Sequence, residues 1–177
     1  MTLALPLAQT LRDCLEESLN DRANPLPEER VQLRFGAELF PDRAQDPDEC
    51  CPGIAWVRIV ETVPRFTQDD AQARCVQSLR RTTLEMSVYR CMPTPGPGAL
   101  VTADQWAAVT VQAESDHSAM EAALCCFVET VLSPVAPVAG DPDIFAGPWT
   151  PLGPDANCVG SAMSVIIEHG CACGTEG

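Results

Sequence analysis

The sequence predicts an α+β fold, a mainly antiparallel sheet of about four strands packed by an N-terminal helix and one long central helix. Near the N-terminus and again after residue 102, apolar residues recur every three or four positions, as in amphipathic helices. Elsewhere apolar and polar residues alternate, which is typical of strands that bury one face. The predicted strands are mostly grouped before the long helix, and their connections are too short for repeated parallel crossovers.

Both helices are predicted from apolar spacing and from residues suited to helix starts. The first is expected over residues 4–20, because Pro6 suits a first turn and five apolar residues repeat at helical spacing: Leu7, Leu11, Cys14, Leu15 and Leu19. The second begins after Thr102, which forms a capping-box pattern with Gln105. Its core-facing residues are expected to be Trp106, Val109, Met120, Ala123, Phe127, Val128 and Val131. The polar residues 114–118 leave open a kink or two shorter helices.

Four strands are predicted, and a proline-rich stretch separates the last of them from the long helix. The strands are expected at 31–35, 54–63, 82–90 and 159–168. Prolines recur from residue 133 onward, so only short extended pieces such as 149–152 are expected there.

The chain has the length and apolar content of one domain. It has 177 residues, of which 46% are hydrophobic, enough to bury a core. A single domain over 1–177 is expected, with extended loops at 41–50, 92–101 and 133–158 and a short flexible tail at 170–177.

Charge composition excludes several function classes. The chain carries 25 acidic residues against 11 basic ones, all of them arginine, for a net charge of −14. Sequence-independent binding to nucleic acid depends on cations that neutralise phosphates, so that class is disfavoured. No apolar run approaches the ~18 residues of a bilayer span, and the N-terminus lacks the cationic region of a signal peptide. We therefore expect a soluble intracellular protein without a membrane partner or a targeting segment.

The 10 cysteines do not form a recognisable zinc motif or disulfide framework. Their share lies below the ~8–10% of disulfide scaffolds, and no C-x-x-C occurs. The vicinal pairs at 50–51 and 125–126 are expected to pack as small apolar side chains. Disulfides between the loop that ends at Cys51 and the connector that contains Cys75, or between Cys91 and the long helix, are the alternative. One sequence does not establish the pairing.

Two histidine-containing clusters have the residue types of functional sites. Residues 116–118, Asp-His-Ser, have the residue types of a hydrolytic triad, but neighbours on a helix diverge, so a solvated helix face is expected. His169, Cys171 and Cys173 would share one face of an extended strand. A fourth metal ligand would come from one of three further cysteines: Cys50, Cys51 or Cys158. A packed or disordered tail is the favoured interpretation.

Carboxylates are also clustered, without the regular spacing of a calcium loop: Asp46, Asp48, Glu49, Asp141 and Asp143. The sequence contains no G-x-S-x-G elbow and no phosphate-binding glycine motif. No catalytic, cofactor-binding or metal-binding residue is therefore assigned, no cofactor is predicted, and no enzymatic activity is expected.

Four segments together carry a resemblance to a known family. They are DECCPGIAWVR at 48–58, LEMSVYRCMPTP at 84–95, ALCC at 123–126 and GPWTPLGP at 147–154. In combination they resemble a small neck protein of actinobacterial siphophages, over most of the chain from residue 48 onward. The predicted order of elements is similar to that of the tail-terminator family.

The resemblance implies a structural virion protein, assembled in the host cytoplasm and located in the tail neck. Members form a ring, expected to be hexameric, that caps the tail tube and joins it to the head-side connector. The implied partners are further copies of the chain, the tail-tube protein and the connector proteins. DNA would pass through without specific binding, which an acidic lumen would favour. The family has no enzymatic site, so no functional residue is carried over.

Other interpretations stay open beside the terminator. Long loops and many cysteines depart from the compact family pattern, which leaves a head-to-tail stopper or connector ring in play. A cytosolic adaptor or inhibitor that binds a protein through its proline-rich loops is a further alternative. A metal-dependent or thiol enzyme has the weakest support.

Overall fold

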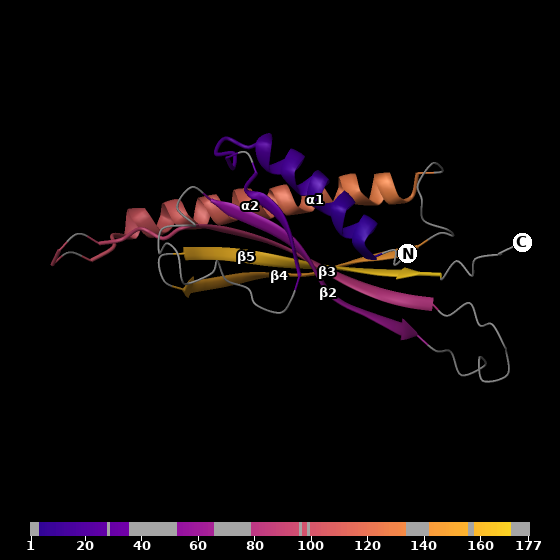
Figure 1. Ribbon diagram of the computed structural model, residues 1–177. Coiled ribbons are helices and arrows are strands. Elements are labelled where there is room, and N and C mark those ends of the chain that lie inside the picture. The colour runs from indigo at the N-terminus through magenta and orange to yellow at the C-terminus, as the bar shows by residue number, and fades with distance from the viewer. Residues whose placement is uncertain are drawn as a thin grey trace, which may run out of the picture.

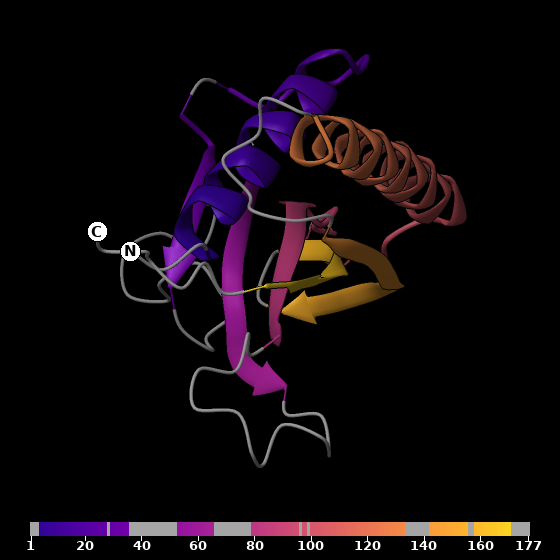
Figure 2. The same cartoon turned by 90° about the vertical axis from the view of Figure 1, so that its right-hand side faces the viewer.

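The computed structural model describes residues 4–27, 29–35, 53–65, 79–95, 97–98, 100–133, 142–155 and 158–170. These residues form two helices that lie against one face of a five-stranded sheet (Figure 1; Figure 2). The elements are α1 (Ala4–Asn20), β1 (Val31–Phe35), β2 (Ile54–Arg65), β3 (Leu79–Cys91), α2 (Ala103–Val131), β4 (Asp143–Asp155) and β5 (Cys158–His169). The predicted α+β class is confirmed.

The sheet is mixed, with the strand order β1-β2-β3-β5-β4. Four strands, β2, β3, β5 and β4, pair antiparallel, whereas β1 pairs parallel to β2. The sequence predicted about four strands, so the sheet is one strand larger than expected and contains one parallel pair. A parallel pair needs a crossover of roughly a dozen residues or more, and the segment 36–53 between β1 and β2 is long enough to supply it.

The additional strand is β4, and it occupies half of the extended loop expected at 133–158. It contains Pro148, Pro151 and Pro154, which led to the prediction of only short extended pieces. β4 lies at the sheet edge and pairs with β5 alone. Proline has no N–H to donate. On an edge strand it is tolerated where the backbone nitrogen faces away from the neighbouring strand, because no ladder hydrogen bond is lost there. The register shifts at 146–149 and at 152–155, around two of the prolines.

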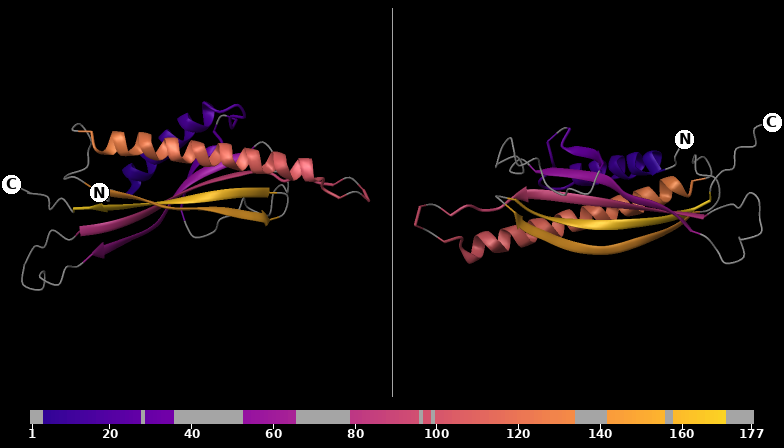
Figure 3. Two further views of the ribbon diagram at one scale, coloured as in Figure 1. Left: turned by 180° about the vertical axis from the view of Figure 1, so that it is seen from behind. Right: turned by 60° about the horizontal axis from the view of Figure 1, so that its bottom comes forward.

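The long helix α2 begins at the predicted capping box and is continuous through its polar middle, without division into two helices. The Gln105 N–H donates to Thr102 Oγ1 at 3.2 Å, and the Thr102 N–H donates to Gln105 Oε1 at 2.8 Å. Its buried residues begin only at Asp116. The expectation that Trp106 and Val109 face the core is therefore wrong, because the first half of α2 contributes no buried residue before Asp116. The start of the helix extends past the ends of β4 and β5 (Figure 3).

The main core lies between the two helices and the sheet. α1 contributes the predicted face of buried leucines and Cys14, and α2 contributes its second half, including Phe127. The helix-facing positions of the sheet alternate along each strand, as at Val57 and Met86. A smaller cluster is formed by the alternate strand residues, whose side chains lie on the other face of the sheet. There the rings of Trp56 and Tyr89 stack with their centroids 4.9 Å apart.

Candidate interaction surfaces

A groove lies beneath the first half of α2. Its volume is about 770 Å³, and it lies between α2 and the neighbouring ends of β3, β4 and β5. Its main apolar lining residues are Met92, Trp106, Val109, Trp149, Leu152 and Val159. We call this surface the α2 groove.

The helix half above the groove has the composition of a buried segment but is exposed. Residues 105–113 contain no charged side chain. Trp106 is 41% exposed and Val111 is 71% exposed. A helix side with this much uncovered apolar surface is typical of a segment that contacts another molecule.

A buried ion pair closes the inner end of the groove. The Arg90 guanidinium donates to both carboxylate oxygens of Asp116, at 2.8 and 3.1 Å. Arg90 also donates to the Asn24 carbonyl at 3.1 Å, and the Gln112 amide donates to Asp116 at 3.0 Å. The pair thereby joins β3 to α2 where the helix leaves the core. The expectation of a solvated helix face at Asp116 is wrong, because Arg90 on β3 provides a partner that helix spacing does not reveal.

The Asp-His-Ser segment 116–118 does not assemble a hydrolytic triad. The His117 ring stacks on Trp149, with centroids 4.7 Å apart, while Asp116 is engaged by Arg90. The Ser118 carbonyl accepts a hydrogen bond from Arg22 at 2.8 Å. The side chains of Asp116 and His117 therefore point to different neighbours, as expected for consecutive positions on a helix.

The β2–β3 hairpin projects from the body at the other end of the molecule. We call residues 62–65 of β2 and 79–82 of β3 the hairpin end. In Figure 1 it lies at the lower right, whereas the first half of α2 lies at the left, and Figure 2 shows it extending away from the helices. Val63 in the hairpin end is 38% exposed, and nearby Val60 is 45% exposed.

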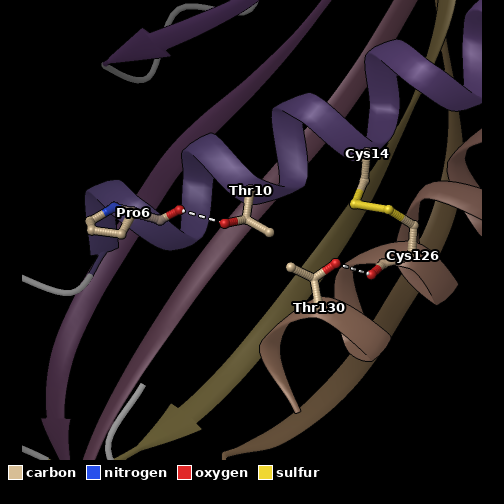
Figure 4. The surroundings of a disulfide bond; sticks show 5 residues. All are labelled: Pro6, Thr10, Cys14, Cys126 and Thr130. Atoms are coloured by element: carbon tan, nitrogen blue, oxygen red, sulfur yellow. Dashed lines mark hydrogen bonds between the residues drawn. A yellow bond between two sulfur atoms is a disulfide. The ribbon is translucent and has the colours of Figure 1, made fainter. Parts of the chain in front are cut away.

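Two helices are joined covalently through their cysteines (Figure 4). Cys14 of α1 and Cys126 of α2 form a disulfide with a Cα–Cα distance of 5.8 Å. Cys125 beside it is exposed and free. The expectation that both cysteines of the 125–126 pair pack as apolar residues is therefore wrong. Helical spacing placed Cys14 on the buried face, but no local signal connects it to a residue 112 positions away.

A second pair of cysteines lies on the sheet. Cys91 and Cys158 are both disulfide-bonded and face one another in the register of β3 and β5. Cys126 is bonded to Cys14 and Cys125 is free, so a disulfide from Cys91 to the long helix is wrong. The predicted residues at 50, 51 and 75 lie outside the described part of the chain.

The histidine considered as a metal ligand is engaged inside the fold. His169 is 4% exposed, and its Nε2 lies 3.0 Å from Thr82 Oγ1. Cys158 lies at the opposite end of β5 and is disulfide-bonded, so it does not complete a site with His169. Cys171 and Cys173 fall outside the described residues. Within the residues described, no group of three or more His, Cys, Asp or Glu side chains is arranged to hold a metal.

The carboxylates considered for calcium are not brought together in the described segments. Asp143 is exposed at the start of β4, and the others lie outside the described residues: Asp46, Asp48, Glu49 and Asp141. No described helix has the length and hydropathy needed to cross a membrane.

Known families do not identify the chain. Comparison with protein-family models gives no match, and no curated protein matches the sequence.

Proposed function

We propose that this protein is a structural subunit of a tailed-phage neck. It acts as a tail terminator, forming a closed homo-oligomeric ring that caps the tail tube and joins it to the head-side connector. The observation that carries the proposal is the exposed apolar half of α2, with its groove, on an otherwise well-packed subunit. The resemblance of residues 48–58, 84–95, 123–126 and 147–154 to siphophage neck proteins supports this assignment.

The arrangement of surfaces favours an assembly subunit. The first half of α2, which covers the groove, and the projecting hairpin end lie at opposite ends of the molecule (Figure 3). Contacts between unlike surfaces of identical subunits continue from copy to copy, and they close into a ring when the rotation between copies permits it. A hexamer is the expected size, by resemblance to the terminator family.

Charge pairing supports passage of DNA without a specific grip. The chain carries a net charge of −14. Three of its arginines, Arg58, Arg81 and Arg90, pair with carboxylates at 2.7–2.8 Å. Arginines neutralised within the subunit contribute little to phosphate binding, so DNA would pass along the assembly without being retained.

Electron microscopy of phage particles assembled without this protein tests the proposal. Overlong tail tubes unattached to heads are the expected result, because tube polymerisation would lack its terminator. Normal tails correctly joined to heads would refute a neck role. Tails of normal length that remain separate from leaking heads would instead assign the chain as a head-to-tail stopper.

A further inference from the structure

We infer that the hairpin end of one copy docks into the α2 groove of the next copy. The inference rests on the proposed ring and identifies its subunit contact. It commits to a second copy of this chain as the occupant of the groove.

The described strands of the hairpin end lie apart from the helices and expose an apolar side chain. The pairing of β2 with β3 shifts register between Ile59 and Glu61, which marks a bulge or irregularity. Bulges increase strand twist and bend a hairpin, and the hairpin end lies apart from the helices (Figure 2). Val63, opposite Arg81 in the register, offers apolar surface at this projecting end.

The groove offers a complementary apolar surface. Trp106 and Val109 line one wall from α2, and Trp149 and Leu152 line the other from β4. Trp106 retains 41% of its surface exposed in the isolated subunit. Aromatic side chains in partly formed pockets are frequent anchors of protein–protein interfaces, so Trp106 is the expected centre of this contact.

Charge adds a second form of complementarity. Arg80 lies in the hairpin end and makes no ion pair with any described residue. Exposed Glu114 lines the α2 groove and is likewise without an ion pair in the described segments. Arg80 is therefore available to pair with Glu114 in the groove of a neighbouring copy.

The geometry favours contact between copies over contact within one. The hairpin end and the first half of α2 project in opposite directions, so a subunit does not fill its own groove (Figure 1; Figure 3). A groove at one end and an insert at the other define a heterologous interface. Each copy then uses both surfaces, and the contact propagates from subunit to subunit.

Two substitutions separate the surfaces. Val63→Asp places a charge on the hairpin end, and Trp106→Asp removes the aromatic anchor of the groove. Each variant alone is expected to weaken self-association by roughly 30-fold or more, the effect of losing an interface hot spot. Native mass spectrometry and analytical ultracentrifugation would measure the oligomers. Leu132→Asp, at an exposed apolar residue beyond the other end of α2 and outside the groove, is the matched control and should assemble like wild type.

Mixing the two variants provides the decisive measurement. The Val63→Asp chain keeps an intact groove, and the Trp106→Asp chain keeps an intact hairpin end. Their mixture should therefore form a 1:1 heterodimer that grows no further, whereas wild type forms larger assemblies. A heterodimer also shows that both variants are folded.

Three outcomes would overturn the inference. The first is that rings persist in either single variant. The second is that the mixture stays monomeric although each variant retains the wild-type circular dichroism spectrum. The third is that the wild-type chain remains monomeric at high concentration. Failure here is distinguishable from failure of the proposed function. Rings that form through another surface, together with overlong tails in particles lacking the protein, would leave the terminator role standing.

Discussion

Arg90 on β3 and Asp116 on α2 form a buried two-point ion pair at the inner end of the α2 groove. Their side chains are 11% and 4% exposed, and two hydrogen bonds join the guanidinium to the carboxylate. Asp116 is also the first buried residue along α2. The pair therefore marks the boundary between the packed half of the helix and its projecting half.

Removing one partner of this pair should be costly. Asp116→Ala leaves the Arg90 charge buried without its carboxylate, and the expected loss in free energy of unfolding is about 3–5 kcal/mol. Replacing both residues, Arg90→Met with Asp116→Leu, should recover much of that loss because no unpaired charge remains. Urea denaturation measures all three proteins, with exposed Glu129→Ala as the control on the same helix. A cost below about 1 kcal/mol for Asp116→Ala would contradict a buried pair.

The disulfide between Cys14 and Cys126 should stabilise the contact between α1 and α2. It joins residues separated by 112 positions, so it restricts the unfolded chain strongly. Replacing both cysteines with alanine should lower the free energy of unfolding by about 2–5 kcal/mol. Cys125→Ser, which alters the exposed free thiol next to it, is the matched control and should leave stability unchanged. Non-reducing peptide mapping that fails to link the Cys14 and Cys126 peptides would refute the pairing.

Gly160 on β5 should not tolerate a larger residue. A Cβ at this position would collide with the Val88 carbonyl oxygen and lie 2.8–2.9 Å from the Tyr89 ring. Backbone atoms on a central strand do not move aside easily, so Gly160→Ala should cost about 1–3 kcal/mol. Gly170→Ala is the control, because a Cβ there meets no atom of the described residues within 4 Å. Thermal unfolding compares the two, and equal melting temperatures would contradict the predicted clash.

The protein should bind duplex DNA very weakly. With a net charge of −14 and several arginines paired internally, few cations remain to displace counterions. At physiological salt we expect a Kd weaker than ~10⁻⁴ M, the weak limit of non-specific binding. Filter binding with a basic DNA-binding protein as positive control measures this. A Kd near ~10⁻⁶ M would contradict passage of DNA without retention.

The elements recovered from sequence are those specified by neighbours along the chain. The leucines of α1 repeat every three or four residues, and the capping box at Thr102 uses a partner three positions away. The alternation in β3 directly records which side chains face the helices. These signals depend on local geometry, so they are readable without the fold.

The prolines of β4 illustrate a signal that depends on position in the sheet. In a central strand, Pro148 and Pro151 would each remove a ladder hydrogen bond, and a loop was the reasonable expectation. At the edge the same residues are tolerated. Local sequence does not state whether a strand is central or at the edge, because that depends on which other strands pair beside it.

The sequence by itself determined the α+β class, both helix starts, the strands at 31–35, 54–63, 82–90 and 159–168, and the acidic character of the chain. Tertiary structure alone decided that Arg90 meets Asp116, that Cys14 meets Cys126, and that the first half of α2 lies over an open groove. The physical reason is distance along the chain. Helical and strand periodicity arise within a few residues, whereas these contacts join residues that only the packing of α1 and α2 on the sheet brings together.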